Sequence, residues 1–392
     1  MRNSLSVKLL LIVTCFSSLS FAGSKDQLNP IYTGVPSLTI TPDARSGGMG
    51  DVGAATSADV NSQYWNPSKY VFMDSPAGVS LSYTPWMSKI VKDINLAYLA
   101  GYYKLNDKQA ISASLRYFSL GSIDLTNEDG SQIGSTTPNE FSVDVAYSRL
   151  LTERLSAGVA LRYISSNLTG GMVDNYYTGT SIAADVSATY KKPIQLSTSD
   201  GSLAFGANIS NIGSKISYDK GEHNIFLPTN MRIGSSFLYP IDQYNSLTAS
   251  LDLNKLLVPS KPLADNYVTT NYSDGYSNPS YVSDLETYNN ESPISGIFKS
   301  FGDGFSEEMK EIAWAFGLEY AYNKQFMVRG GYFHESETKG NRKYFTAGVG
   351  FKLNMFQLDA SYVIAAAQTN PLDQTLRFTL AFDLNGMKDF MK

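Results

Sequence analysis

Side chains suited to catalysis or metal binding are scarce in this sequence. Its 392 residues include one cysteine, Cys15, and two histidines, His223 and His334. An exported chain that had lost Cys15 would have neither a disulfide framework nor a thiolate metal site. Two histidines far apart in sequence leave few ways to build a histidine-rich zinc site or a Ser-His-Asp triad. We therefore expect no catalytic residues, no metal site, no cofactor and no enzyme activity.

A basic charge balance and a long apolar run are also missing. The formal net charge is −5, so no basic surface argues for a nucleic-acid partner. No stretch after residue 22 reaches the roughly 20 apolar residues of a membrane helix. These absences exclude a nucleic-acid-binding protein and a helical membrane protein.

The first 22 residues have the pattern of a secretory signal peptide. Arg2 and Lys8 form a positive start, residues 9–13 are apolar, and Ser20-Phe21-Ala22 offers small residues at the cleavage positions. Polar residues interrupt the apolar run, which argues against a membrane anchor. We expect cleavage near Ala22.

Tyrosine and phenylalanine are abundant, and polar and apolar residues alternate from about residue 77 to the end. The chain has 26 Tyr and 20 Phe against 3 Trp, which suits the aromatic girdles of a membrane barrel. In 141–148 and 376–384, every second residue is apolar and the residues between them are mostly polar or small. Charged residues such as Asp144, Arg162 and Asp252 fall on the face opposite the apolar one. This is the pattern of strands with one face in lipid and one in a lumen.

Fourteen such strands are predicted, an even number as expected for a bacterial barrel. They lie near 77–85, 93–104, 107–120, 139–151, 153–166, 176–191, 200–212, 228–239, 245–255, 309–322, 325–334, 342–353, 355–364 and 372–385. Connections after even-numbered strands are mostly tight, and those after odd-numbered strands are longer and polar. By this parity both histidines fall at the outer end of the barrel. We predict an all-β fold, a 14-stranded antiparallel transmembrane β-barrel formed by residues 77–392.

Residues 23–76 lack alternation and are rich in small and turn-forming residues. They contain the pattern A-R-x-G-G-M-G-D-x-G-x-A at 44–55 and W-N-P-S at 65–68. The glycines permit close backbone packing, so we expect a compact irregular element. A phosphate loop is disfavoured because no strand precedes the glycines and no GK[ST] follows them.

These motifs resemble the N-terminal hatch of the FadL-like barrels and, more narrowly, the PorV family of type IX secretion systems in Bacteroidota. The resemblance covers the whole chain, although Asn66-Pro67-Ser68 stands where FadL proteins carry N-P-A. It implies that residues 23–76 plug the lumen. We predict that Trp65, Asn66 and Pro67 pack this plug against the wall rather than contact a ligand.

The outer loop 256–308 is unusually long and rich in aromatic residues. Its tyrosines, including Tyr276 and Tyr281, lie among small polar residues, which is the chemistry of adaptable binding surfaces. Near its end, apolar residues recur at the spacing of one face of a short helix: Ile294, Ile297, Phe298, Phe301 and Phe305. This helix either caps the barrel mouth or docks a partner, and the sequence leaves both alternatives open.

The resemblance implies a shuttle in type IX secretion at the outer membrane of a Gram-negative bacterium. Its partners would be the translocon barrel, secreted cargo with a C-terminal sorting domain, the sortase/attachment complex, and the lipid and lipopolysaccharide of the outer membrane. Two alternative functions are also compatible with the sequence. A FadL-type transporter of hydrophobic small molecules needs an apolar pocket and a lateral opening, and a lipid A deacylase needs a Ser/His pair at the outer rim.

Overall fold

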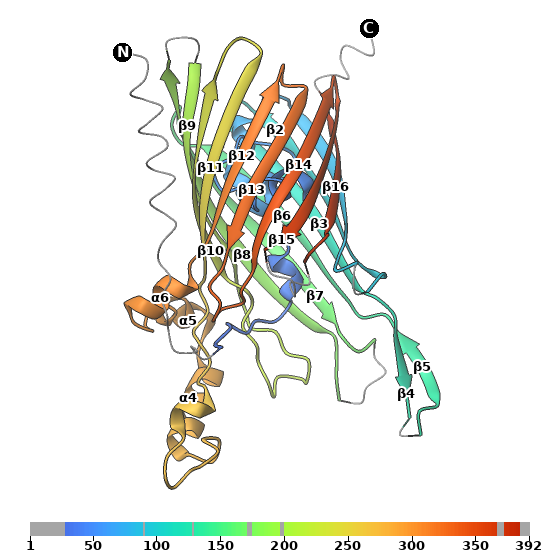
Figure 1. Cartoon of the computed structure of the whole chain (residues 1–392), viewed down its shortest axis with the longest axis vertical. Coiled ribbons are helices and arrows are strands. Elements are labelled where there is room, and N and C mark those ends of the chain that lie inside the picture. The colour runs from blue at the N-terminus through green and yellow to red at the C-terminus, as the bar shows by residue number, and fades with distance from the viewer. Residues whose placement is uncertain are drawn as a thin grey trace.

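The computed structural model describes residues 28–88, 91–127, 129–170, 175–196, 200–366 and 372–384. The expected signal peptide and its cleavage position lie outside these residues. Fourteen antiparallel strands form a closed barrel around a plug of short helices (Figure 1). In order they are β1 (Ala77–Pro85), β2 (Ile94–Asn106), β3 (Gln109–Leu120), β6 (Asn139–Leu150), β7 (Leu155–Asn167), β8 (Gly179–Gln195), β9 (Asp200–Gly213), β10 (Asn230–Pro240), β11 (Asn245–Leu256), β12 (Ala313–Tyr322), β13 (Phe326–His334), β14 (Lys343–Leu353), β15 (Phe356–Ala365) and β16 (Leu376–Asp383). The predicted fold class and strand number are confirmed.

Each barrel strand pairs with its neighbour in sequence, and β1 closes the barrel by pairing with β16. At the closure Val79 lies opposite Phe382 and Leu81 lies opposite Leu380. Closure satisfies the backbone hydrogen bonds of both edge strands, which is a requirement for a sheet that spans a bilayer.

Burial along the strands is inverted relative to a water-soluble protein. On β1, Ser80 and Ser82 are buried in the lumen, whereas Val79, Leu81 and Tyr83 are 43–54% exposed on the outer wall. The same alternation follows most of the other strands. An apolar outer wall and a polar interior are typical of a barrel whose solvent outside is lipid. Among the described helices, none has the length and apolar character needed to cross a bilayer.

The connections differ in length at the two ends of the barrel. Six short turns join β2 to β3, β6 to β7, β8 to β9, β10 to β11, β12 to β13 and β14 to β15. The longer connections lie at the opposite end, which is the extracellular end in outer-membrane barrels. We call the two ends the periplasmic and the outer end.

Two parts of the outer end differ from the sequence-based prediction. The connection after β3, predicted only as long and polar, contains a hairpin, β4 (Ile123–Thr126) and β5 (Gln132–Thr136). The predicted strand start at residue 309 is wrong, because helix α6 (Phe305–Glu311) precedes β12. The long connection also holds η3 (Ala264–Tyr267), α4 (Pro279–Asn290) and α5 (Pro293–Lys299).

Candidate functional site: the plugged lumen and its outer mouth

The segment before the barrel fills the lumen and is the hatch of this barrel. It forms η1 (Pro36–Thr39), α2 (Ala44–Gly47), α3 (Ser62–Trp65) and η2 (Pro67–Phe72). The Asp43 side chain caps α2 by accepting a hydrogen bond from the Ser46 amide at 2.9 Å. The same carboxylate accepts the indole N–H of Trp65 at 2.6 Å. Asp43 thus joins the two sequence motifs of the hatch into one unit.

Trp65, Asn66 and Pro67 are all buried inside the lumen. Gly53 lies directly over the Trp65 ring, where a Cβ atom would overlap the indole. The Asn66 amide donates to the Ala54 carbonyl at 2.8 Å and to the Thr189 hydroxyl of β8 at 3.0 Å. These contacts join the glycine-rich segment, the W-N-P-S segment and the barrel wall.

An ion-pair network connects the hatch to the wall on the side of β12, β13 and β15. Arg45 of the hatch pairs with Glu319 at 3.2 Å and with Asp59 at 2.7 Å. Glu319 also pairs with Arg329, which reaches Asp359 at 2.6 Å. Removing one member of such a buried network leaves an uncompensated charge, which typically costs about 3–5 kcal/mol.

Hatch amides donate to side chains on several strands. The amides of Gly53 and Ala54 donate to Asp252 of β11, at 2.8 and 2.9 Å. Hydroxyl acceptors serve two more amides: Thr379 of β16 accepts from Ala44 at 2.9 Å, and Thr346 of β14 accepts from Gly50 at 2.8 Å. The hatch is therefore bonded around much of the barrel circumference.

Wall glycines make room for the hatch backbone. A Cβ atom at Gly206, Gly317 or Gly331 would overlap backbone atoms of residues 49–54. Sequence reasoning did not identify these glycines as hatch contacts. Each of these glycines occupies a lumen-facing position of a strand. Close approach of another backbone is one usual reason for glycine at such a position.

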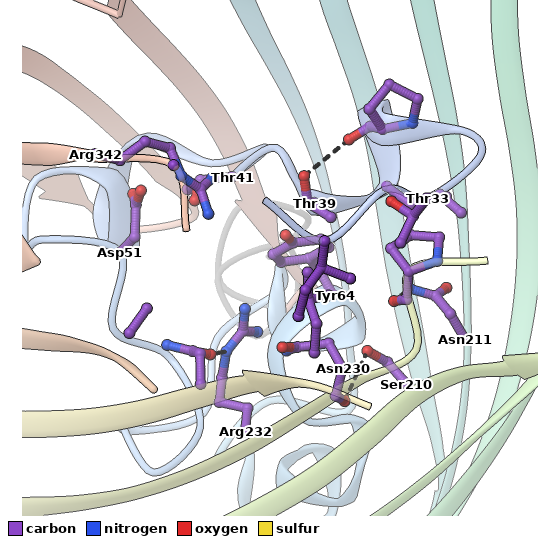
Figure 2. Close-up of a pocket in the computed structure, with 18 of the residues that line it drawn as sticks. Thr33, Thr39, Thr41, Asp51, Tyr64, Ser210, Asn211, Asn230, Arg232 and Arg342 are labelled. Atoms are coloured by element: carbon purple, nitrogen blue, oxygen red, sulfur yellow. Dashed lines mark hydrogen bonds between the residues drawn. The ribbon is translucent and has the colours of Figure 1, made fainter. Parts of the chain in front are cut away.

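Cavities lie on both sides of the hatch. The outer cavity, of about 290 Å³, is lined by hatch residues such as Thr39 and Tyr64 and by outer strand ends such as Asn230 (Figure 2). The inner cavity, of about 420 Å³, faces the periplasmic end and is lined by residues such as Lys69 and Lys352. The hatch therefore separates an outer space from an inner one.

The long outer connection forms an arm that projects past the barrel rim (Figure 1). Tyr276 is 65% exposed, whereas Tyr281 is buried and contacts the rings of Tyr276 and Tyr267 at 5.6 and 5.5 Å. At the base of the arm, Lys215 donates to the Asn289 carbonyl at 2.9 Å. We define the arm as residues 257–312.

The predicted single helix over residues 294–305 is wrong. Helix α5 ends at Lys299 and α6 begins at Phe305. Gly304, directly before α6, has a φ of 85°, which lies outside the helical region and prevents one continuous helix. Ile297 is half-buried on α5. Phe298, Phe301 and Phe305 are 74%, 50% and 82% exposed. We call these three phenylalanines the phenylalanine patch.

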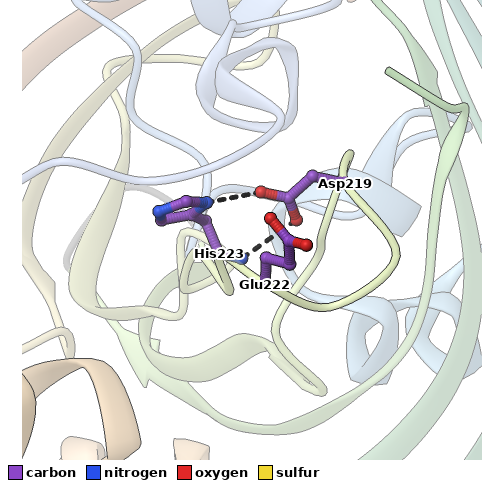
Figure 3. Close-up of side chains that lie close together, drawn as sticks. All are labelled: Asp219, Glu222 and His223. Carbon is purple, nitrogen blue, oxygen red and sulfur yellow. Dashed lines mark hydrogen bonds and ion pairs between the residues drawn. The ribbon is translucent and has the colours of Figure 1, made fainter. Parts of the chain in front are cut away.

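The two histidines lie at the outer end, as the loop parity predicted. His223 is in the β9–β10 connection, where its ring pairs with Asp219 at 2.5 Å beside Glu222 (Figure 3). Hydrogen bonds from the His223 amide, the Ser217 hydroxyl and the His223 ring hold the pKa of Asp219 well below its usual range. His334 ends β13 and stacks on Trp314 at 5.2 Å. The bond to Asp219 gives His223 a role in ordering the β9–β10 connection, and packing on Trp314 gives His334 a structural role.

A closed barrel with an apolar outer wall and a plugged polar lumen defines this protein as an outer-membrane β-barrel with an internal hatch. Residues 23–263, more than half of the chain, match the family described as type IX secretion system protein PorV. The chain belongs to this family, and the resemblance seen in the sequence is confirmed. No curated protein sequence matches the chain.

Solved structures of similar architecture share little sequence with this chain. The toluene transporter TodX of Pseudomonas putida is 11% identical, with a TM-score of 0.48, over 92% of this chain and 100% of that one. A FadL homologue of Pseudomonas aeruginosa is also 11% identical, with a TM-score of 0.43, over 91% and 99% of the two chains. Neither likeness bears on what this chain binds.

Proposed function

We propose that this barrel is a shuttle of type IX secretion in the outer membrane of a member of the Bacteroidota. It binds secreted cargo that carries a C-terminal sorting domain at the translocon barrel, and it delivers this cargo to the sortase/attachment complex at the cell surface. Membership in the PorV family carries the proposal. The hatch supports it, because a barrel filled by a bonded plug is suited to binding partners rather than to conducting a polypeptide.

The arm is the proposed docking site. Tyr276 and the phenylalanine patch are exposed at the outer end, where large apolar side chains can contact a partner. Tyr281 has a different role in this proposal: its buried ring maintains the shape of the arm. Ile297, half-buried on α5, is a lesser contact in the same proposed site.

Binding rather than catalysis is part of the proposal. A lipid A deacylase would need a serine hydrogen-bonded to a histidine at the outer rim. In the described residues the His223 ring is bonded to Asp219, and the His334 ring nitrogen faces the Tyr332 hydroxyl at 3.5 Å. Neither arrangement activates a serine.

The test replaces residues 265–290 with a short Gly-Ser linker and measures cargo at the cell surface. We expect barrel assembly, followed by heat-modifiable electrophoretic mobility, to persist while surface-attached cargo falls at least tenfold. The matched control replaces residues 127–131, at the tip of the β4–β5 hairpin, with the same linker. Normal secretion by the arm variant would contradict the proposed role of the arm.

A second variant tests the phenylalanine patch without shortening the chain. Phe298→Ser, Phe301→Ser and Phe305→Ser together should reduce surface-attached cargo, since each ring is at least half exposed and contributes little to folding. Val282→Ser, on an exposed position of α4, is the control for an apolar change elsewhere on the arm. Equal cargo levels in the triple variant and the control would exclude the patch.

A further inference from the structure

The outer wall of the barrel has a groove on the side formed by β2, β3, β6, β7 and β8, which are consecutive in the sheet. Its volume is about 770 Å³. Small residues form its floor: Gly101 of β2 pairs with Ala113 of β3, and Ala184 lies on β8. Tyr103 and Tyr147, which are 55% and 37% exposed, stand beside this floor. The groove therefore lies in the surface that faces lipid, outside the lumen and separate from both cavities.

The groove lies nearer to the periplasmic end of the barrel than to the outer end. Tyr103 is close to the periplasmic end of β2 at Asn106 and far from its outer end at Ile94. Ile111 pairs with Tyr103 on one side and with Tyr147 on the other, so the same level continues across β3 and β6. The acyl chains that cover the groove therefore belong to the periplasmic leaflet.

Arg149 lies at the periplasmic end of the groove. It follows Tyr147 on the outward face of β6, where successive residues of one face are about 7 Å apart. Its neighbours on the adjacent strands are Gln109, whose side-chain oxygen accepts from the Tyr147 hydroxyl at 2.9 Å, and the small Ala157. The Arg149 side chain is exposed and has no hydrogen-bond or ion-pair partner among the described residues. A free guanidinium group is thus placed where the apolar groove ends.

Cationic side chains are concentrated at the periplasmic ends of the same strands. In residues 103–109, 147–157 and 188–196 the cations outnumber the acids Asp107 and Glu153: they are Lys104, Lys108, Arg149, Arg154, Lys191 and Lys192. Lys104 is engaged inside the barrel, where it donates to the Met73 carbonyl at 2.8 Å, but the other five are exposed.

The rest of the periplasmic rim has no such excess of positive charge. Among the described residues at the periplasmic ends of β9 to β16, three acids stand against two cations: Asp200, Asp242 and Asp383, and Lys324 and Lys352. The basic part of the rim is therefore limited to the side of the barrel that carries the groove.

We propose that the groove holds an acyl chain of an anionic phospholipid whose phosphate binds Arg149. The hydrophobic effect does not drive this binding, because the chains of bulk lipid are as apolar as the groove. The fit of a chain into the hollow and the charge-assisted hydrogen bonds between guanidinium and phosphate stabilise it. The neighbouring cations add a positive potential that favours a headgroup with net negative charge over a zwitterionic one. This site does not depend on the secretion proposal.

Native mass spectrometry of the full chain, purified in detergent micelles, tests the preference. The chain is incubated with equal amounts of phosphatidylglycerol and phosphatidylethanolamine that have identical acyl chains, and the retained lipids are counted. We expect about fivefold more phosphatidylglycerol, because one cation near an anionic lipid surface contributes roughly that factor. Equal retention of the two lipids would overturn the proposal.

Two variants locate the site. Arg149→Gln should remove the preference for phosphatidylglycerol, and Ala113→Phe, which fills the groove from an exposed position, should lower the retention of both lipids. The matched controls are Lys324→Gln, in the β12–β13 turn, and Ala347→Phe, at an exposed position on β14. Both controls should behave as the unmodified chain, and heat-modifiable mobility checks that every variant is folded.

Three results would overturn the proposal at this stage. The preference could survive Arg149→Gln, or lipid retention could be the same in Ala113→Phe and Ala347→Phe. A stable dimer of the unmodified chain that Ala113→Phe abolishes would instead identify a second copy of the chain as the occupant of the groove.

Discussion

Asp252 holds two amides of the hatch with one carboxylate oxygen. Its side chain is fully buried on the lumen face of β11 and accepts from Gly53 and Ala54. Hydrogen bonds to a charged group contribute about 1.5–3 kcal/mol each, more than neutral ones. The residue therefore stabilises the docked hatch rather than the barrel, whose own strands are paired by backbone hydrogen bonds.

Asp252→Ala should loosen the hatch by about 2–5 kcal/mol, because it leaves two buried amides without an acceptor. We expect faster amide hydrogen exchange at residues 50–56 while strand amides keep their protection. Asp200→Ala, at an exposed position of β9, is the matched control. Unchanged exchange at residues 50–56 would show that Asp252 does not hold the hatch.

Gly331 and Gly330 form a natural pair of test positions. A Cβ atom at Gly331 would overlap Met49 and Gly50 of the hatch, whereas one at Gly330 would lie 3.9 Å from the carbonyl oxygen of Thr346. Gly331→Ala should destabilise the docked hatch by about 1–3 kcal/mol, as overpacking does. Gly330→Ala should change little. Limited proteolysis of the hatch measures both, and equal cleavage rates would contradict the close fit.

Helix α6 is attached to the barrel mouth by charge. Glu307 pairs with Lys339, in the β13–β14 connection, at 2.8 Å, and Glu311 pairs with the same lysine at 3.0 Å. Burial would raise the pKa of Glu307, but the bond to Lys339 and the charge of Lys310 outweigh it and lower the pKa below its ordinary value. The pair therefore stabilises docking above the ordinary glutamate pKa, and this contribution is lost as the pH falls through the lowered value.

Glu307→Gln should loosen α6 at neutral pH by about 0.2–1 kcal/mol, the range of surface ion pairs. The wild-type helix should remain docked at pH 5 and loosen in stronger acid, whereas the variant should lack the part of this response that comes from Glu307. Amide exchange of α6, corrected for intrinsic rates, measures the difference. Asp303→Asn, in the exposed segment before α6, is the control. Identical pH profiles for wild type and Glu307→Gln would contradict the role of the pair.

Among the elements, the strands were predicted well and the outer connections were not. Alternation in 77–85 matched β1 residue for residue, because one face in lipid and one in the lumen leaves a strong period of two. The β4–β5 hairpin was missed because its strands are short and mostly exposed on both faces. The single helix over 294–305 failed because a spacing pattern carries no information about the backbone of Gly304.

On the scale of the whole molecule, the hatch divides the lumen into an outer and an inner cavity. The full chain in a planar lipid bilayer should therefore show no stable open conductance. Gly331→Ala, which crowds the hatch, should add openings that Gly330→Ala does not. A steady conductance from the unmodified chain would contradict a closed lumen.

Family resemblance predicted that residues 23–76 would plug the lumen. The sequence did not predict which contacts hold the plug in place. The lumen-facing charges Asp144, Arg162 and Asp252 were placed on the correct face by alternation. Their partners depend on which strands face each other across the barrel, and on the path of an irregular segment that has no periodicity.

We propose that this barrel acts by binding secreted proteins, and affinity purification is the direct test of that binding. The tagged chain is recovered from gently solubilised membranes, beside the variant that lacks residues 265–290, and the co-purifying chains are identified by mass spectrometry. We expect the full chain to recover a very large translocon barrel, or secreted proteins that still carry a C-terminal β domain. The variant should recover less of both. Recovery of the barrel alone, with bound apolar small molecules, would contradict it and favour a transporter.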